Sequence, residues 1–264
     1  MNFGLIIVGD EILSGKRADK HLPKVIELLA ARGLALSWAR YVGDDAQQIT
    51  ADLVHAFGCG DVVFSCGGIG ATPDDHTRQC AAQALQRPLE LHPQARELIL
   101  ERMRDMAKEQ GVGYEPDRSD NVHRLNMGVF PQGASIIPNP YNKIAGFSVG
   151  SVYFVPGFPV MAWPMIEWVL DQRLSHLHRA MGVREKSVIV FGGLEATLTP
   201  LMLQIEAQFA GIKVFSLPSV DHPQWGRHIE LGVKGDAADI DAAYAQLLVG
   251  LGEAQVRLGP ELVR

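Results

Sequence analysis

Cysteine is scarce in this chain of 264 residues, which holds only Cys59, Cys66 and Cys80. Their number is odd and their spacing matches no metal-binding motif, so the sequence predicts neither a disulfide framework nor a structural zinc site. Unpaired thiols are typical of a reducing compartment, and we expect a cytoplasmic protein. Cys66 lies beside a glycine turn, but the sequence offers no evident basic partner that would make it a nucleophile.

An excess of positive charge is also missing. The chain has 24 Lys and Arg against 30 Asp and Glu, which gives a formal net charge of −6. This balance argues against general electrostatic attraction to nucleic acid or to an anionic membrane, and we expect neither as a partner. An anionic ligand would need local help from backbone amides, a few cations or a metal ion.

The chain lacks an uninterrupted apolar run that could cross a membrane. Residues 144–170 are largely apolar, but Pro156, Pro159 and Pro164 interrupt them, and proline breaks a helix. The N-terminus enters a predicted strand at residues 3–8 without a basic segment or cleavage site, so we expect no signal peptide.

Strand and helix patterns alternate through the first half of the chain, which is typical of a mostly parallel sheet with helices on both faces. The predicted strands are 3–8, 35–41, 61–65, 134–137 and 152–155, and the main predicted helices are 21–32, 43–57, 78–85 and 92–110. After residue 180 the order becomes β-α-β-β-α, which indicates a small α+β domain near the ferredoxin-like type. We therefore expect an α/β domain over residues 1–175 and an α+β domain over 180–255. The Arg- and His-rich segment 171–184 would bridge them, and the last dozen residues would be loose.

Residues 61–77 carry the strongest chemical signal. An apolar strand ends there in a turn that holds Gly67, Gly68, Gly70, Thr72, Asp74 and Asp75, and a helix follows. Such a junction leaves N–H groups unpaired at the positive end of a helix dipole, and glycine lets an anion approach closely. It favours a phosphate site with a divalent cation between phosphate and carboxylate, although no Lys follows the glycines as in a P-loop. A tight turn with Asp75 as a helix cap is the alternative.

Acidic residues also follow two other predicted strands. Asp10, Glu11, Ser14, Gly15 and Asp19 come after the first strand, and Asp44 and Asp45 come after the second. The carboxyl ends of parallel strands line the crevice where open α/β sheets bind ligands. Glu11 and Asp44 are therefore candidate metal ligands together with Asp75, while helix capping and solvation are the alternative.

Two proline turns flank the last predicted strand of the first domain. The first turn contains Asn139, whose amide could contact a polar ligand, and the second contains Gly157. Lys143 lies between them and is a candidate charge partner for a phosphate. Ordinary turn chemistry is the alternative for all three residues.

Together these motifs resemble the MoaB/Mog-type molybdopterin-binding domain, and most of all the form at the N-terminus of CinA proteins. The matching stretches are residues 9–15 with Asp19, 42–45, 67–77, 137–140, 146–147 and 156–159, in the order of the family and within residues 1–175. The small domain after residue 180 is similar to the one that follows in CinA proteins. The amidase domain that hydrolyses nicotinamide mononucleotide in full-length CinA has no counterpart in these residues, and we expect no such activity.

The resemblance implies a phosphate or diphosphate on the glycine loop. In molybdenum-cofactor members the site holds the pterin phosphate, and some members adenylylate it. CinA-type relatives are credited with metal-dependent cleavage of ADP-ribose to AMP and ribose phosphate, and a related domain of eukaryotic FAD synthases with similar hydrolysis. Asp44 and Asp75 match acidic positions that are important in the family, so the resemblance implies that they are catalytic here. It also implies a homo-oligomer.

These considerations lead to one main expectation and two alternatives. The main expectation is a pyrophosphatase of the ADP-ribose type that uses Mg²⁺, Mn²⁺ or Co²⁺. The alternatives are a module that binds molybdopterin or another phosphopterin without turnover, and an adenylyltransferase of molybdenum cofactor synthesis. The family's glutamate after the second proline turn is absent at residues 159–162, its Gly-Thr-Ala-Pro is replaced at 142–145, and its asparagine is replaced by His21. The first two changes favour the binding module.

Overall fold

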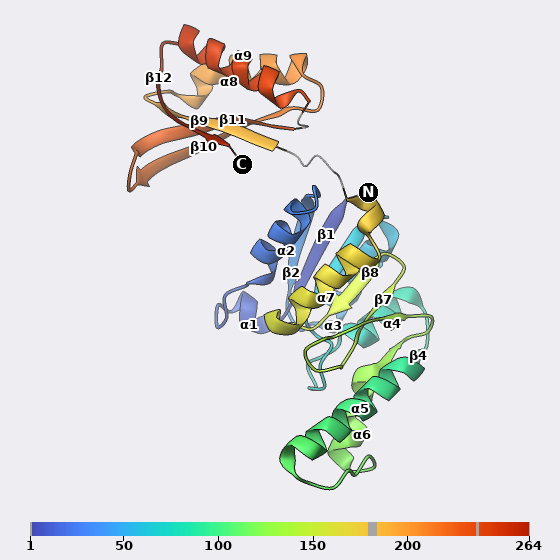
Figure 1. Cartoon of the computed structure of the whole chain (residues 1–264). Helices are drawn as coiled ribbons and strands as arrows, with labels where there is room; N and C mark the ends of the chain where they lie inside the picture. Colours follow the sequence, from blue (N-terminus) through green and yellow to red (C-terminus); the bar gives the residue numbers. More distant parts are fainter. Residues whose placement is uncertain (1, 179–183, 236–237, 264) are drawn as a thin grey trace. The chain divides into compact units, whose positions relative to one another are not determined.

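The computed structural model describes residues 2–178, 184–235 and 238–263. The chain divides into two compact units, one of Met1–Leu29 with Ala35–His178 and the other of Ala30–Leu34 with Arg179–Arg264. Each unit contains its own sheet and core (Figure 1). The expected bridge at 171–184 lies partly outside the described residues, which stop at 178 and resume at 184.

The first unit is built on a mostly parallel sheet, as expected. Its strands, in spatial order, are β2 (Leu36–Val42), β1 (Phe3–Val8), β3 (Val62–Cys66), β8 (Val152–Val155), β7 (Gly146–Val149) and β6 (Ser135–Ile137). The first four run parallel, and β7 is antiparallel to both β8 and β6. Every residue of β1 and β3 is buried, which explains their continuous apolar sequences, because a parallel strand is covered on both faces.

Helices cover both faces of this sheet. They are α1 (Asp10–Leu13), α2 (His21–Ala30), α3 (Ala46–Gly58), α4 (Thr77–Leu85) and α7 (Pro159–Gln172). Figure 1 shows α7 in front of the sheet and α3 and α4 behind it. The predicted helix at 43–57 begins only at Ala46, because Asp45 is its N-cap and accepts from the N–H groups of Gln47 and Gln48.

A smaller helical extension completes this unit. It consists of β4 (Leu89–Leu91), α5 (Pro93–Gln110), α6 (Ser119–Leu125) and β5 (Val129–Pro131), with β4 and β5 paired antiparallel. Three stacked rings connect it to the main sheet. The ring centroids of Phe130 and Phe147 are 4.6 Å apart, and those of Phe147 and Phe154 are 4.3 Å apart. The stack fixes β5 against β7 and β8, whose ends lead into the candidate site.

The long apolar stretch at 144–170 divides between sheet and helix, as Pro156 and Pro159 predict, whereas Pro164 lies inside α7 and does not interrupt it. The stretch contains β7, β8 and most of α7, which begins with Pro159 in its first turn. Within the described residues, no helix combines the length and the apolarity that crossing a membrane requires.

The second unit is an α+β fold with an antiparallel sheet, as expected. Its elements are β9 (Arg184–Phe191), α8 (Glu195–Gln208), β10 (Lys213–His222), β11 (Gly226–Gly235), α9 (Ile240–Glu253) and β12 (Arg257–Val263). The spatial order of the strands is β10-β11-β9-β12, and Figure 1 shows both helices on one face. The expectation of loose final residues was wrong, because β12 pairs with β9 along most of its length. The pairing register shifts between Leu258 and Glu261, which accommodates Pro260. The shift also interrupts the alternation of residues by which a strand is recognised in a sequence.

Candidate functional site

The turn after β3 has a backbone that only glycine fits without strain. Gly67 and Gly68 have φ angles of 106° and 68°. A Cβ atom on Gly67 would lie 2.4 Å from the Val8 carbonyl oxygen, and one on Gly68 would lie 2.1 Å from Thr77 Oγ1. Thr77 fastens α4 to the turn, because its N–H donates to the Gly68 carbonyl oxygen at 3.0 Å and its hydroxyl donates to that of Gly67 at 3.2 Å.

Two of the three glycines keep a backbone N–H for a ligand. The N–H of Gly67 donates to the Val155 carbonyl oxygen at 3.0 Å and so continues the contact between β3 and β8. The N–H groups of Gly68 and Gly70 have no acceptor among the residues that the structure describes. Unpaired amides beside a helix N-terminus suit an anion. Of the three glycines predicted to bind a phosphate, Gly68 and Gly70 have an N–H group available for it, and Gly67 does not.

The turn opens on a cavity of about 360 Å³, which we call the glycine-turn lobe. The predicted site residues that line it are Glu11, Gly67, Gly68, Gly70, Thr72, Asp75, Asn139 and Gly157. Those that do not line it are Ser14, Gly15, Asp19, Asp44 and Lys143. The structure thus gathers residues from two of the three predicted strand ends and from both proline turns around one space.

Asp75 closes the turn on itself. Its Oδ2 accepts from the backbone N–H of Thr72 at 2.9 Å and from the Thr72 hydroxyl at 2.5 Å. The residue at the N-cap of α4 is His76, without a side-chain cap bond. Asp75 therefore does not occupy the capping position proposed as its alternative role, and its carboxylate lies against Gly70 in the lobe.

Arg78 is a buried cation under the glycine turn that the sequence analysis did not identify. It lies in the first turn of α4, is 5% exposed, and donates to the Ile69 carbonyl oxygen. Burial lowers the pKa of its guanidinium, and the charge of Asp75 opposes this shift. Its hydrogen bond to Ile69 ties α4 to the glycine turn and places a positive charge beside it. An arginine this early in a helix, where cations are disfavoured, was the available signal.

Asp44 belongs to a group of neighbouring carboxylates at the ends of β1 and β2. Its Oδ2 accepts from the N–H of Asp10 at 2.9 Å, and Asp10 Oδ1 accepts from the N–H of Asp44 at 3.2 Å. Burial raises the pKa of the Asp44 carboxyl, and the Asp10 N–H opposes this effect. The nearby charges that raise it further belong to Asp10, Glu11 and Asp74.

These carboxylates suit a cation whose coordination is completed by the phosphate of a bound substrate and by water. Within the described part of the chain, no three His, Cys, Asp or Glu side chains are grouped closely enough to hold a metal ion by themselves. Mg²⁺ is often bound by one or two carboxylates together with substrate phosphates and water. Glu11 and Asp75, which line the same lobe, would serve in this way.

The segment between α1 and α2 is held by contacts of three predicted site residues, Ser14, Gly15 and Asp19. Asp19 accepts from the N–H groups of His21 and Leu22, which start α2, and from the hydroxyl of Tyr41. Burial and these contacts with Asp19 raise the pKa of Tyr41 to about 12. The N–H of Ser14 donates to the Asp10 carbonyl oxygen, and Gly15 turns the chain with a φ of 72°.

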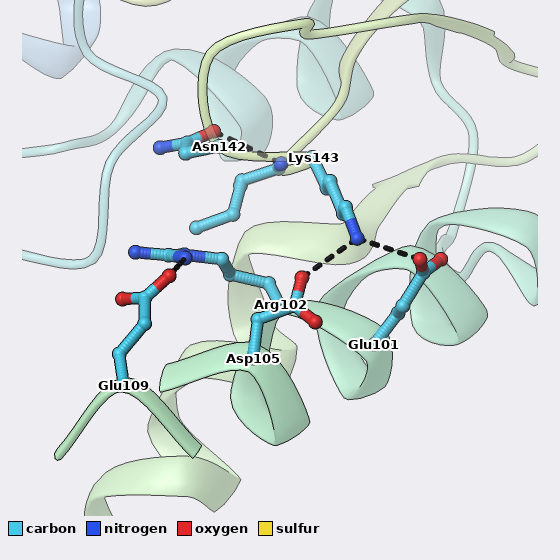
Figure 2. Close-up of polar contacts among 7 residues, drawn as sticks. Glu101, Arg102, Asp105, Glu109, Asn142 and Lys143 are labelled. Carbon is cyan, nitrogen blue, oxygen red and sulfur yellow. Dashed lines mark hydrogen bonds and ion pairs between the residues drawn. The ribbon is translucent and has the colours of Figure 1, made fainter. Parts of the chain in front are cut away.

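Lys143 is paired with carboxylates of α5 rather than directed into the lobe. Its Nζ donates to Glu101 Oε1 and to Asp105 Oδ2, both at 2.6 Å (Figure 2). These two carboxylates, Asp105 first, raise the pKa of Lys143. The buried Asn139 shapes the same loop, because its amide donates to Asn142 Oδ1 and to the Ile144 carbonyl oxygen. The loop is thus fastened to α5 and forms the opposite wall of the lobe.

We expect Lys143→Met to change phosphate affinity by less than a factor of two, because Glu101 and Asp105 hold this side chain outside the lobe. Arg17 is the cation among the described residues that line the lobe, so Arg17→Met should weaken phosphate binding by roughly tenfold. Calorimetric titration of both variants with inorganic phosphate compares the two side chains. A larger loss in Lys143→Met than in Arg17→Met would contradict this assignment.

Cys66 does not have the environment of a nucleophile. Its side chain is buried at the end of β3. Burial, with a contribution from the charge of Asp19, raises the pKa of the thiol far above its ordinary value. A protonated buried thiol packs as a small apolar group.

A second cavity of about 330 Å³ adjoins the first, and we call it the His21 lobe. The two lobes share Val8, Glu11, Arg17, Gly157 and Phe158 in their walls. Arg17 and Phe158 were missed by the sequence analysis, and His21 was noted only as a departure from a pattern. Phe158 is 55% exposed, and a large exposed aromatic residue within a proline turn was the signal that could have identified it.

Comparisons with known proteins show the family to which the chain belongs. Residues 4–176 match the family described as a probable molybdopterin binding domain. The chain is 33% identical to a CinA-like protein of Anaeromyxobacter dehalogenans (strain 2CP-C), over 67% of this chain and 42% of that protein. It is 30% identical to a protein of Aeropyrum pernix, over 97% of this chain and 92% of that protein. The chain thus spans less than half of the CinA-like relative.

A solved structure shows the same fold for the first unit. It is the crystal structure of a CinA protein of unknown function from Thermoplasma acidophilum. The TM-score is 0.53 and the identity 26%, over 65% of this chain and 98% of that one.

Proposed function

Because the chain belongs to the family of probable molybdopterin-binding domains, we propose that its glycine turn binds the phosphate of a nucleotide or pterin. A divalent metal at the same place would support cleavage of a nucleotide diphosphate such as ADP-ribose. The family resemblance expected from the motifs is confirmed. One observation carries the proposal: Gly68 and Gly70, whose N–H groups have no acceptor among the described residues, line the same lobe as Glu11 and Asp75.

Each of these residues has a distinct part in the proposed reaction. The N–H groups of Gly68 and Gly70 bind phosphate oxygens, and Arg17 balances their charge. Glu11 and Asp75 would hold the metal, with Asp75 fixed in place by Thr72. Asp44 does not line the lobe, but its charge lies near Asp10 and Glu11 and would help to attract the metal. A bound Mg²⁺, Mn²⁺ or Co²⁺ supplies a Lewis acid for the phosphoryl oxygen and lowers the pKa of a bound water.

The second candidate function is a module that binds molybdopterin or another phosphopterin without turnover. It is favoured by the absence, among the described residues, of a ready group of three metal-ligating side chains. Met161, which lies where the family has its Pro-x-Glu-Met sequence, lines the lobe without offering a carboxylate. A phosphate cradle needs only the glycine turn, so it functions in either case.

Release of AMP distinguishes the two functions. Purified protein is incubated with ADP-ribose or FAD and with Mg²⁺, Mn²⁺ or Co²⁺, and AMP is quantified by chromatography. We expect AMP from the wild type and a rate lower by roughly 100-fold in Asp75→Ala, with Lys143→Met as the matched control. Equal inactivity of wild type and Asp75→Ala, together with tight pterin binding, would show that the protein is a binding module.

A further inference from the structure

The glycine-turn lobe and the His21 lobe are neighbours, because five residues line both of them. Gly157 lies in both walls, and a Cβ atom on it would lie 3.4 Å from the Cα of Gly67. The glycine-turn lobe offers backbone donors, while Arg17 and Lys20 contribute cationic side chains to the His21 lobe. The two halves therefore differ in the chemistry that they offer to a ligand.

His21 is fixed in one orientation and one tautomer. Its backbone N–H donates to Asp19 Oδ1 at 2.8 Å, and its Nε2 lies 3.0 Å from the Gly157 carbonyl oxygen. A carbonyl oxygen only accepts, so Nε2 carries the proton and donates. In a neutral imidazole the other nitrogen, Nδ1, is then an acceptor.

This acceptor has no donor among the described residues. The His21 side chain is 4% exposed, and Nδ1 is a buried polar atom without a hydrogen-bond partner. Two other described residues have such atoms, Ser65 and Trp163, and neither lines one of the two lobes. Buried acceptors are nearly always paired in native proteins, so an unpaired one at a cavity needs an explanation.

We propose that the His21 lobe receives the part of the ligand that carries hydroxyl or N–H donors, and that His21 Nδ1 accepts one of these hydrogen bonds. The inference rests on the phosphate site proposed above and extends it to the class of ligand. The phosphate lies on the glycine turn, and a sugar or ring with donors fills the second lobe. A second fully ionised phosphate offers only acceptors, so it could pair with Arg17 or Lys20 but would leave Nδ1 without a donor.

The shared residues suit the connection between these two parts. Arg17 reaches both lobes and pairs with a diphosphate bridge better than with either end alone. Phe158 lines both lobes with more than half of its surface exposed, and an aromatic side chain there suits a ligand with a planar group. A nucleotide diphosphate joined to a sugar meets all these conditions, whereas inorganic phosphate meets only those of the glycine turn.

Two substitutions at His21 separate its two nitrogens. In His21→Gln the amide N–H takes the place of Nε2 and can still donate to Gly157, but the acceptor at Nδ1 is lost. In His21→Asn the amide lies near Nδ1 and the contact with Gly157 is lost. Binding of ADP-ribose and of inorganic phosphate is measured by calorimetry in EDTA, which prevents turnover, and thermal unfolding confirms that each variant is folded.

We expect His21→Gln to lower the ratio of ADP-ribose affinity to phosphate affinity by roughly tenfold, the effect of one lost hydrogen bond. His21→Asn should keep this ratio within about twofold. An unchanged ratio in His21→Gln, with ADP-ribose still bound by the wild type, would overturn the role of His21 alone. A wild type that binds neither ligand would overturn the phosphate site itself.

If either variant does not fold, a measurement on the wild type can still test whether His21 Nδ1 accepts a hydrogen bond from the ligand. The ¹⁵N chemical shift of His21 Nδ1 reports whether this nitrogen accepts a hydrogen bond. We expect it to move when ADP-ribose binds and to stay in place when inorganic phosphate binds. A shift with both ligands, or with neither of two ligands that bind, would contradict the proposal.

Discussion

Asp44→Asn is expected to lower the rate of ADP-ribose cleavage by roughly 100-fold and at the same time to stabilise the protein at neutral pH. The rate falls because the substitution removes a negative charge that lies beside Glu11, one of the two proposed metal ligands. The stability rises because Asp44 is partly buried beside Asp10, Glu11 and Asp74, whose charges repel it. The asparagine oxygen can still accept from the Asp10 N–H.

The pH dependence of this effect has a definite sign. The pKa of Asp44 is raised in the folded protein, so the folded state binds the proton more tightly than the unfolded state. Ionised Asp44 therefore destabilises the fold at neutral pH, and this cost disappears as the pH falls through the raised pKa. The advantage of Asp44→Asn, roughly 0.5 kcal/mol by analogy with like-charge neighbours on a helix, should shrink in the same interval.

Urea unfolding of wild type and variant across a series of pH values measures this difference. Asp45→Ala is the matched control, because Asp45 caps α3 through Gln47 and Gln48. Its loss should destabilise the protein by about 1 kcal/mol without the loss of rate. If Asp44→Asn is less stable than the wild type at neutral pH, the carboxylates do not repel one another as described.

Gly68→Ala should abolish phosphate binding and destabilise the first unit by roughly 2–3 kcal/mol. The added Cβ would lie 2.1 Å from Thr77 Oγ1, and the backbone φ of 68° is unfavourable for alanine. Either the turn or the start of α4 must move, and both movements displace the N–H groups of Gly68 and Gly70, which line the lobe. Calorimetry with phosphate and urea unfolding measure the two losses.

Gly111→Ala separates the cost of the backbone angle from that of the clash. Gly111 ends α5 with a φ of 65°, and a Cβ there would meet nothing within 4 Å. We expect about 1 kcal/mol of destabilisation from the angle alone and unchanged phosphate binding. In the double variant Gly68→Ala, Thr77→Ala part of the lost stability should return. If Gly68→Ala costs no more than Gly111→Ala, the contact with Thr77 is not restrictive.

Local features of the fold were predictable from the sequence, and features that depend on distant partners were not. The alternation of apolar strands and amphipathic helices indicated the sheet, because each pattern reflects burial of its own element. β12 was missed because β9, from which it is separated by most of the second unit, supplies its hydrogen bonds. Its Gly259 and Pro260 disguise the strand.

The same distinction applies to the candidate site. The glycine turn was identifiable because its residues are adjacent in sequence and glycine has few other uses there. The partners of Lys143 are Glu101 and Asp105, about forty residues away, and no local pattern reveals them. The N–H of Gly67 is likewise occupied by Val155 from another strand. The orphaned nitrogen of His21 becomes visible only when Gly157 is placed beside it.

The two walls of the glycine-turn lobe depend on different parts of the chain. One wall is closed by contacts within the short segment from Gly67 to Thr77. The other, the loop around Lys143, is fastened to α5 by two ion pairs at the surface. Substitutions in the loop or in α5 can therefore reshape one wall while the other is inherited unchanged. Proteins that descend from one ancestor can therefore retain phosphate binding and differ in the rest of the ligand that they bind.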